Sequence, residues 1–510
     1  AGAEKMTFVS YQFALFLPAV AALFYVCPKR WRMGTLLLAS GLFLILSGGV
    51  RSLAVYGFSV FVAWAAALGS ERFREEKGGV ARLLFWAAVV ILLGLLAGFQ
   101  YINFPGYTAQ EFFWLIGREY DWTPIQTVAP TAISFYTLSL LGYLVEVRWG
   151  VIPAERNPVK LALFGGFFPQ MAMGPIVRYG TLSETLFSGK GAGAERFLGG
   201  LQRILWGLFQ KLVISERLRV IVDTVYSDCE TFGGWYLVLA AAAFAFQLYT
   251  DFAGAMDIAL GAAGLFGVKL PENFRQPFCS RSIAEFWRRW HMTLGAWFKD
   301  FVMYPLLKTD GFQRLGDWGK RHFGKKQGKK IPTVAALLIV WFLLGLWHGG
   351  KWTFIIGSGL YHAVLMAAAL LTEPWQKKFY SLTGMNKENP VWVFFQRVRT
   401  FVLVSAGFVL FRSDSLKMAG EIFKGMFSGN AGQLAAEGLG VLGLNGADGA
   451  VLLLSLGLLG AVSHWKAVHG NQEGKPEIRG AVCAILAFAI LIFGFYGRGY
   501  DPSAFIYARF

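Results

Sequence analysis

The sequence predicts an all-α polytopic membrane protein, and three observations support this prediction. Of the 510 residues, 55% are hydrophobic and 15% are charged, whereas soluble proteins carry about 25% charged residues. Several apolar runs approach the roughly 20 residues that a helix needs to cross a bilayer. No polar stretch is long enough for a separate soluble domain, so residues 6–510 are expected to form a single transmembrane domain.

The apolar runs define the expected membrane segments. Residues 1–5 precede Met6 and are expected to be a cloning remnant, and the apolar run after Met6 has no cleavage signature and is expected to be the first span. Two of the runs are too short to span upright and are expected to be tilted, broken or re-entrant; they are Gly34–Gly49 and Val451–Val462. The others are Phe8–Val26, Val55–Leu68, Leu83–Ile102, Ile125–Val147, Lys160–Ile176, Phe197–Ile214, Trp235–Phe266, Ile331–Gly349, Trp352–Thr372, Val391–Phe411 and Ala481–Gly494.

The net charge of +17 comes from basic residues that cluster between the apolar runs. The clearest cluster is the stretch from Lys308 to Lys330, which we expect to be a basic loop. Such clusters are typical of cytoplasmic loops that face anionic lipids, so membrane lipids are expected partners and nucleic acid is not. Docking of an anionic acyl donor on this stretch is the alternative interpretation.

Glycine and proline interrupt the segment Lys160–Ile176, which contains Gly165, Gly166, Pro169 and Pro175. These residues break helices, and non-helical backbone at membrane depth must be buried in protein or line a wet cavity. We therefore expect a re-entrant or broken segment that lines a cavity. A plain interfacial loop is the alternative.

The stretch from Ile283 to Val302 is amphipathic at helical spacing and is expected to be an interfacial helix. Arg288 and Arg289 fall off its apolar face, whereas His291 leans toward it. The apolar face consists of Ile283, Phe286, Trp287, Trp290, Leu294, Trp297, Phe298 and Phe301. A packed, hydrogen-bonded interfacial histidine is the simpler interpretation of His291.

His348 is the strongest candidate for chemistry among the six histidines. It closes an uncharged run beside Trp347, and Gly345 and Gly349 would allow another helix or a substrate to approach closely. An ionisable group at membrane depth is by default a functional candidate, and imidazole accepts a proton near neutral pH. The remaining histidines are expected to be structural, His362 by packing or hydrogen bonding and the others at the surface; these are His322, His464 and His469.

Two carboxylates, Asp251 and Asp257, lie in an apolar run near Gln247 and Tyr249. A buried carboxylate usually has a partner, so we expect pairing with Arg281, Arg288 or Arg289, or else a polar lining of a reaction tunnel. The four cysteines are scattered, and neither a nucleophile elbow nor a zinc-protease motif occurs. No metal is expected.

Taken together, several stretches resemble the membrane-bound O-acyltransferases, in particular their bacterial alginate-acetylating and teichoic-acid D-alanylating branch. The resemblance extends from Met6 to Phe510 and is strongest from Arg281 through Trp297 and from Gly345 to Trp352. The other matching stretches are Pro130–Thr137, Gly165–Arg178, Tyr249–Asp257, Leu270–Phe274, Phe411–Ser413 and Phe505–Tyr507.

This resemblance implies a fold and a set of site residues. It implies about eleven transmembrane helices with interfacial and re-entrant helices, arranged as a ring around a thinned centre that a tunnel crosses, with the core signature in residues 130–412. It implies that His348 is the catalytic histidine and His291 the second signature histidine. The residues expected to support the tunnel are Trp347, Gly349, Trp352, Trp287, Arg288, Arg289, Trp290, Asp251, Asp257, Gln247, Tyr249, Ser134 and Tyr136.

The resemblance also implies an activity in the bacterial inner membrane. An acetyl group would pass from a cytoplasmic thioester, acetyl-CoA or an acyl carrier protein, toward hydroxyls of an extracytoplasmic polysaccharide. A secreted or membrane-anchored partner, such as an SGNH-type acetyltransferase, would relay it, and no bound cofactor is needed. The alternatives are D-alanyl transfer toward teichoic acid, a polymer or lipid transporter without covalent chemistry, and a membrane scaffold for a secreted enzyme.

Overall fold

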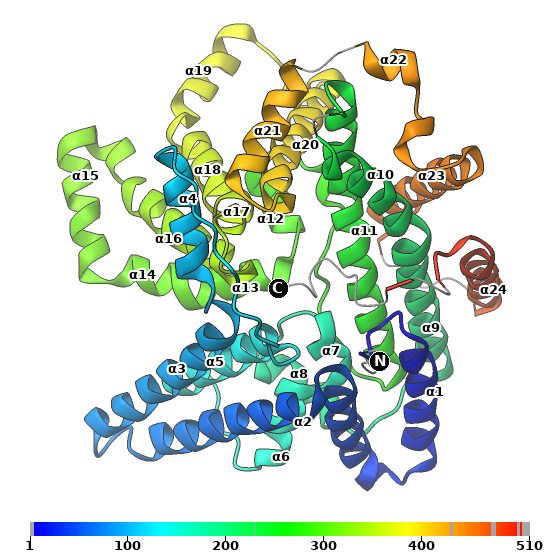
Figure 1. Cartoon of the computed structure of the whole chain (residues 1–510). Helices are drawn as coiled ribbons and strands as arrows, with labels where there is room; N and C mark the ends of the chain where they lie inside the picture. The colour runs from blue at the N-terminus through cyan, green and yellow to red at the C-terminus, as the bar shows by residue number, and fades with distance from the viewer. Residues whose placement is uncertain (1–4, 230, 429–431, 471–475, 497–499, 502–510) are drawn as a thin grey trace.

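In the computed structural model, the described residues form helices joined by turns and loops, without a strand among them (Figure 1). The structure describes residues 5–229, 231–428, 432–470, 476–496 and 500–501. The all-α prediction is therefore confirmed. The matching stretch Phe505–Tyr507 lies outside the described residues.

Seven helical stretches of the described chain are long and apolar enough to cross a membrane. This confirms the prediction of a multi-pass membrane protein. A shorter apolar helix, α1 (Tyr11–Val26), accompanies these seven stretches. The seven are α2 (Lys29–Arg72), α3 (Gly78–Gln100), α11 (Trp235–Leu265), α16 (Ile331–His348), Trp352–Leu371, α20 (Pro390–Arg412) and α23 (Gly446–His469). The stretch Trp352–Leu371 comprises α17 (Trp352–Phe354), the π-helix η4 (Ile355–Leu360) and α18 (Tyr361–Leu371).

Helix α11 is the most buried of these stretches, and α9 (Ala194–Phe209) lies against it (Figure 1). Glycines bring the two backbones together. A Cβ added at Gly207 would lie 2.4 Å from the carbonyl oxygen of Gly254, and one at Gly261 would lie 2.5 Å from that of Gly200. In a membrane the hydrophobic effect does not drive helices together, and close packing stabilises their contact instead. Small residues at such crossings allow this close packing.

Helix α9 continues through a π-helical turn, η1 (Gln210–Ser215), into α10 (Glu216–Ser227). The predicted segment Phe197–Ile214 is therefore part of a longer helical run. The predicted segment Ala481–Gly494 lies on α24 (Pro476–Phe493). The remaining helices outside the site are α8 (Tyr179–Leu186), α19 (Glu373–Thr383), α21 (Leu416–Ser428), α22 (Gln433–Glu437) and η5 (Gly440–Leu442).

Three of the expected segments have different bounds in the structure. Gly34–Gly49 and Val55–Leu68 are not separate, because both belong to α2, which bends at Gly49 (φ 76°). The left-handed φ suits glycine, which has no Cβ to clash. Val451–Val462 is neither broken nor re-entrant, because it is the middle of the continuous 24-residue helix α23. His464 and His469 accordingly lie on this helix and not in a loop.

The first part of the expected segment Ile125–Val147 is wrong. Residues 118–130 have no regular secondary structure, and α5 spans Ile133–Trp149. Pro130 and the left-handed Ala132 (φ 63°) stand directly before the helix, and proline pushes the residue before it out of the helical region. The apolar periodicity did not predict α4 (Phe104–Leu115), which precedes this loop.

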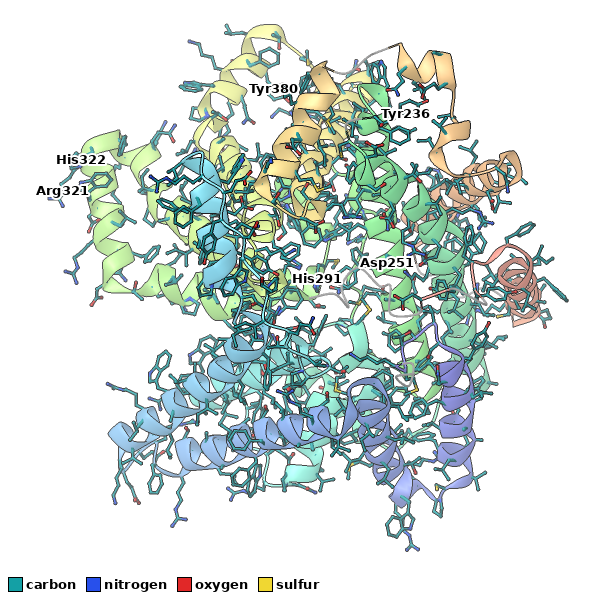
Figure 2. The ribbon with its side chains drawn as sticks, in the orientation of Figure 1. Tyr236, Asp251, His291, Arg321, His322 and Tyr380 are labelled. Atoms are coloured by element: carbon teal, nitrogen blue, oxygen red, sulfur yellow. The ribbon has the colours of Figure 1, made fainter. Side chains whose placement is uncertain are left out.

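The stretch from Lys308 to Lys330 is not a loop, because it ends α14 (Tyr304–Lys308) and forms α15 (Asp310–Gly328). Helix α15 bends at Gly324 (φ 74°) and projects at the left edge of the molecule in Figure 1. Its basic residues Arg321 and Lys325 are exposed. The surface prediction for the neighbouring His322 is confirmed (Figure 2).

The glycine- and proline-rich segment is broken, as expected. Helix α6 (Pro158–Gly166) ends at Gly166, and α7 (Phe168–Met173) begins after the single residue Phe167. The three residues Gly166, Phe167 and Phe168 are fully buried. The break thus lies inside the protein, where neighbouring residues surround the irregular backbone.

Candidate functional site

His348 is the last residue of α16 and is 3% exposed. Its ring packs against Trp347 at 5.0 Å and Phe411 at 5.5 Å between centroids. Gly349 (φ 148°) follows at once, and a Cβ there would meet the ring of Phe354 at 2.8 Å. The sequence prediction that small residues permit close approach around His348 is confirmed. Gly345 shows the same, since a Cβ on it would lie 2.6 Å from the Cα of Ile355 in η4.

His291 lies in a turn between two short helices, α12 (Ile283–Arg289) and α13 (Met292–Phe298). The prediction of one continuous helix from Ile283 to Val302 is therefore wrong. His291 adopts a left-handed conformation (φ 44°, ψ 52°), which costs about 1–2 kcal/mol for a residue with a side chain. The helical run resumes after it through the π-helix η3 (Lys299–Met303). His291 is buried, with 3% exposed.

Asn273 holds this turn from a loop that the sequence analysis did not assign to the site. Its side chain lies within 3.1 Å of His291 Nδ1. The backbone N–H and the hydroxyl of Thr293 both donate to its Oδ1 at 3.0 Å, and the N–H of Met292 donates to its backbone carbonyl at 3.0 Å. The matching stretch Leu270–Phe274 pointed to this loop, but the contact is between residues 18 apart and has no local signal.

Trp347 brings the two histidines into one cluster. Its ring centroid lies 5.8 Å from that of His291 and 5.0 Å from that of His348. Phe252 of α11 closes the other side of His291 at 4.8 Å, and Phe135 of α5 packs on Trp347 at 5.5 Å. Figure 2 shows His291 in the middle of the molecule. The residues predicted from sequence as the centre of the site thus meet in space.

The other signature residues of this region lie around the cluster. Trp290 is buried against Phe286 and Phe408, and Trp287 packs on Trp341. The packing role expected for His362 is confirmed, since it is buried against Trp287 at 4.8 Å. Trp352 donates from its indole to Thr108 at 3.0 Å, on the side of α4. Arg288 is exposed, and Arg289 pairs with Glu285 within α12.

The two carboxylates of α11 have other partners than those expected. Asp251 is fully buried and pairs with Lys211 of η1, which also meets Glu216 at 2.7 Å. Neither Arg281 nor the arginines of α12 pair with it, because Arg281 binds Glu388 instead. In Figure 2 Asp251 lies on α11. Pairing as such is confirmed, but the partner of Asp251 comes from the π-helix η1 that follows α9.

Asp257 belongs to a second charged cluster, which is centred on Arg203 of α9. The Arg203 guanidinium lies 2.8 Å from the Asp257 carboxylate and 2.6 Å from the Glu272 carboxylate. Gln210 also donates to Asp257 at 2.8 Å. Burial alone would raise the pKa of the Glu272 carboxyl, but the hydrogen bonds and charge of Arg203 outweigh it and hold that pKa below its ordinary value. This cluster ties the Asn273 loop to α9 and α11.

Gln247 lies on α11 one turn before Asp251, and Tyr249 lies between the two. The Gln247 side-chain oxygen is buried without a hydrogen-bond partner among the described residues. Tyr249 packs on Phe274 and Trp290, next to the histidine turn. Gln247 is buried and Tyr249 is half-buried, and their support of a tunnel stays a prediction.

A cavity of about 200 Å³ opens beside the histidine turn, between α5, α13 and the segment after α7. Thr293 contributes to its wall, so Asn273 touches both this wall and His291. Arg178 lies at the cavity and pairs with Glu146 and Asp300. Its other walls include Leu138, Gly142, Ile176 and Trp297.

A narrower space shares Ser139 and Ile176 with this cavity. Tyr136 and Gln170 line it, and its wall residue Phe135 contacts Trp347. Tyr136, predicted to support a tunnel, therefore lines a space next to the cluster, and Ser134 precedes Phe135 on the same helix. Among the described residues no group of three His, Cys, Asp or Glu side chains is placed to hold a metal ion.

Comparisons with known proteins match the region that contains the cluster. A family model described as MBOAT, membrane-bound O-acyltransferase family, matches residues 153–411. The probable alginate O-acetylase AlgI of Pseudomonas syringae pv. tomato is 31% identical over 428 residues, which is 82% of this chain and 75% of that protein.

Two further relatives are named for other polymers. The peptidoglycan O-acetyltransferase of Helicobacter pylori is 28% identical over 367 residues, 66% of this chain and 64% of that protein. The teichoic acid D-alanyltransferase of Bacillus subtilis is 30% identical over 292 residues, 56% of this chain and 70% of that protein. His291, His348 and Asn273 all lie inside the matched family region, whereas Ser134 and Tyr136 precede it.

Proposed function

The chain belongs to the membrane-bound O-acyltransferase family, and from this premise we propose that it moves an acetyl group from a cytoplasmic thioester toward hydroxyls of an extracytoplasmic polysaccharide. The family is one of acyltransferases, so the transporter hypothesis is set aside. The relative with the broadest match reported above is named an alginate O-acetylase, which supports acetyl as the group and a polysaccharide as the acceptor. D-alanyl transfer is the second candidate, because a teichoic acid D-alanyltransferase also matches.

One observation carries the proposal most directly: two buried histidines, one at the end of α16 and one in the turn between α12 and α13, contact the same indole, Trp347. His348 would take the proton of the acceptor hydroxyl as its oxygen attacks the thioester carbonyl. A carbon–oxygen bond forms, the carbon–sulfur bond breaks, and the proton passes to the departing thiolate. An ester and a thiol result, so the balance needs no metal or redox partner.

The cavity beside α13 supports a route for the donor. Thr293 lines it next to the histidine turn, and Arg178 lines it on the segment after α7. The donor is acetyl-CoA or an acyl carrier protein, and both carry phosphate on the arm that holds the thioester. Arg178 pairs with Glu146 and Asp300 and would exchange one of these carboxylates for the phosphate, to which an arginine is complementary. Closely packed walls would hold the acyl carbon near the attacking oxygen, which is the main contribution that positioning makes to transfer.

The acceptor side of the proposal includes a second protein. A secreted or membrane-anchored SGNH-type acetyltransferase, or a similar relay protein, would receive the acetyl group and pass it to the polysaccharide. A scaffold role for this chain is compatible with its own catalysis. Deleting the relay protein should abolish polymer acetylation and should also stop release of thiol by the membrane protein, because the acetyl group then has no acceptor hydroxyl.

The test compares cells that carry the wild-type protein, His348→Ala or the exposed control His322→Ala, at matched abundance in the membrane. Mild alkali releases ester-linked acids from the isolated polymer, and mass spectrometry identifies them. Loss of acetate with His348→Ala and not with His322→Ala supports the proposal. Loss of D-alanine instead selects the second candidate, and unchanged esters with His348→Ala overturn the role of His348.

A further inference from the structure

We infer that Asn273 is a positioning residue that fixes the tautomer of His291, so that His291 donates a hydrogen bond to the acyl carbonyl and does not act as a second base. The inference rests on the proposed function for its substrate, but the tautomer itself follows from contacts in the structure. It gives the two histidines different roles: His348 removes a proton, and His291 stabilises the charge that develops on the carbonyl oxygen.

The first step is the orientation of the Asn273 amide. The backbone N–H of Thr293 lies 3.0 Å from the Asn273 atom Oδ1. A backbone N–H can only donate, so this amide atom must be the oxygen. The Thr293 hydroxyl also lies 3.0 Å from Oδ1, and it accepts the N–H of Ile176 at 3.1 Å. Its own hydrogen is therefore directed to Oδ1, which receives two hydrogens in all.

The second step assigns the hydrogen between Asn273 and His291. Oδ1 has two lone pairs, and Thr293 uses both. The amide nitrogen Nδ2 lies 3.1 Å from His291 Nδ1, closer than Oδ1 at 3.3 Å. Nδ2 therefore donates and Nδ1 accepts, while the other Nδ2 hydrogen faces the Met256 sulfur at 3.3 Å. Every hydrogen and lone pair of the amide then has a partner.

The third step follows from imidazole chemistry. A neutral histidine carries one ring hydrogen, so a ring whose Nδ1 accepts must carry it on Nε2. The neutral form is favoured here, because His291 is 3% exposed between Phe252 and Trp347 and an isolated buried charge is costly. If His291 acted as a base through Nε2, its hydrogen would lie on Nδ1 and would have to be donated to Asn273 Oδ1. Both lone pairs of that oxygen already accept hydrogens from Thr293.

The backbone fixes where this donor is held. His291 has a left-handed φ of 44°, and the N–H of the next residue, Met292, donates to the Asn273 carbonyl at 3.0 Å. Asn273 thus binds both the ring and the turn that carries it. Trp347 contacts the His291 ring and the His348 ring alike. An acyl group held next to this indole would be within reach of a donor from the turn between α12 and α13 and of a base from the end of α16.

The consequence is that the two histidines tolerate different substitutions. Removing one hydrogen-bond donor from an oxyanion site typically lowers kcat by about 10²–10³-fold. His291→Gln retains an N–H near the position of Nε2, whereas His291→Glu offers a carboxylate that accepts and cannot donate. Asn273→Asp replaces the donating Nδ2 with an oxygen, which reverses the tautomer by drawing the hydrogen to Nδ1.

The test has a spectroscopic arm that needs no substrate. The full-length protein is labelled with ¹⁵N-histidine in lipid bilayers, and solid-state NMR reports which ring nitrogen of His291 is protonated. The His291 signal is identified by its loss in His291→Gln. We expect Nε2–H in the wild type and Nδ1–H or the imidazolium in Asn273→Asp. An Nδ1–H ring in the wild type overturns the inference, whatever the activity of the protein.

The activity arm measures release of thiol from acetyl-CoA and ester-linked acetate in cells, at equal amounts of folded protein. We expect His291→Glu and Asn273→Asp to lose about 10²–10³-fold in kcat with little change in KM, and His291→Gln to stay within about tenfold of the wild type. Equal loss in His291→Gln and His291→Glu overturns the donor role. If His348→Ala also leaves transfer intact, the proposed function has failed separately, and the NMR result still decides the tautomer.

Discussion

Thr293 links three parts of the site through one hydroxyl. It accepts the N–H of Ile176 at 3.1 Å, donates to Asn273 at 3.0 Å and contributes to the wall of the 200 Å³ cavity. Ile176 lines the cavity as well. A residue without titratable chemistry therefore joins the donor route to the turn that carries His291.

The change Thr293→Val removes this hydroxyl while keeping the shape of the side chain. One net hydrogen bond is worth about 1 kcal/mol, and about 1.4 kcal/mol corresponds to tenfold in rate, so acetyl transfer should fall about fivefold. Thr293→Ser keeps the hydroxyl and should restore most of the rate. Thiol release from acetyl-CoA measures both, and equal rates in Thr293→Val and wild type would contradict this link.

At the scale of elements, the sequence predicted which residues are buried better than where helices begin and end. The apolar periodicity of Ile283–Val302 continues across His291 because Trp290 and Leu294 are both buried. The break comes from Asn273, 18 residues away, and no local pattern contains it. The partner of Asp251 was missed for the same reason, since Lys211 comes from a π-helical turn of another helix.

Lys211 is buried between Asp251 and Glu216. Glu216 also forms an ion pair with Arg219 at 2.7 Å. Lys211→Met therefore removes the cation that lies between two buried carboxylates. Removing one partner of a buried ion pair costs about 3–5 kcal/mol, so the thermal unfolding temperature in detergent should drop markedly. The double variant Lys211→Met, Asp251→Asn removes both charges and should recover most of the loss; no recovery would rule out charge as the cause.

The α9–α11 crossing offers a matched pair of glycines. A Cβ at Gly207 would lie 2.4 Å from the Gly254 carbonyl oxygen, whereas a Cβ at Gly264 finds its nearest atom, the Cα of Gly200, at 3.8 Å. Gly207→Ala should destabilise the protein by about 1–3 kcal/mol through overpacking. Gly264→Ala should be neutral or stabilising, because alanine favours helix. Thermal unfolding measures both, and equal effects would mean that the crossing can relax.

For the whole molecule, the sequence predicted the class of fold, the membrane location and the residues that meet at the centre. Apolar runs determine how often a chain can cross a membrane, and these are local. The cavity is different, because it lies among α5, α13 and the segment after α7, which are distant in sequence. Its lining residues Gly142 and Trp297 become neighbours only when the helices assemble.

Gly142 provides the test of this cavity as the donor route. It lies on α5 against Trp297 and Phe301, which would stand 3.1 Å and 3.3 Å from a Cβ added to it. Gly142→Leu should fill part of the 200 Å³ space and raise the KM for acetyl-CoA about tenfold or more, because a misplaced donor loses the benefit of positioning.

The control is Gly57→Leu on α2, where an added Cβ finds no atom within 4 Å. Both variants replace a glycine in a helix interior, so both should gain the same helix propensity. Their stability should therefore differ only through the packing at the cavity, and steady-state kinetics on protein of equal thermal stability separates a blocked route from a damaged fold. A raised KM in Gly142→Leu alone supports the route, whereas unchanged kinetics would mean that the thioester reaches His348 by another path.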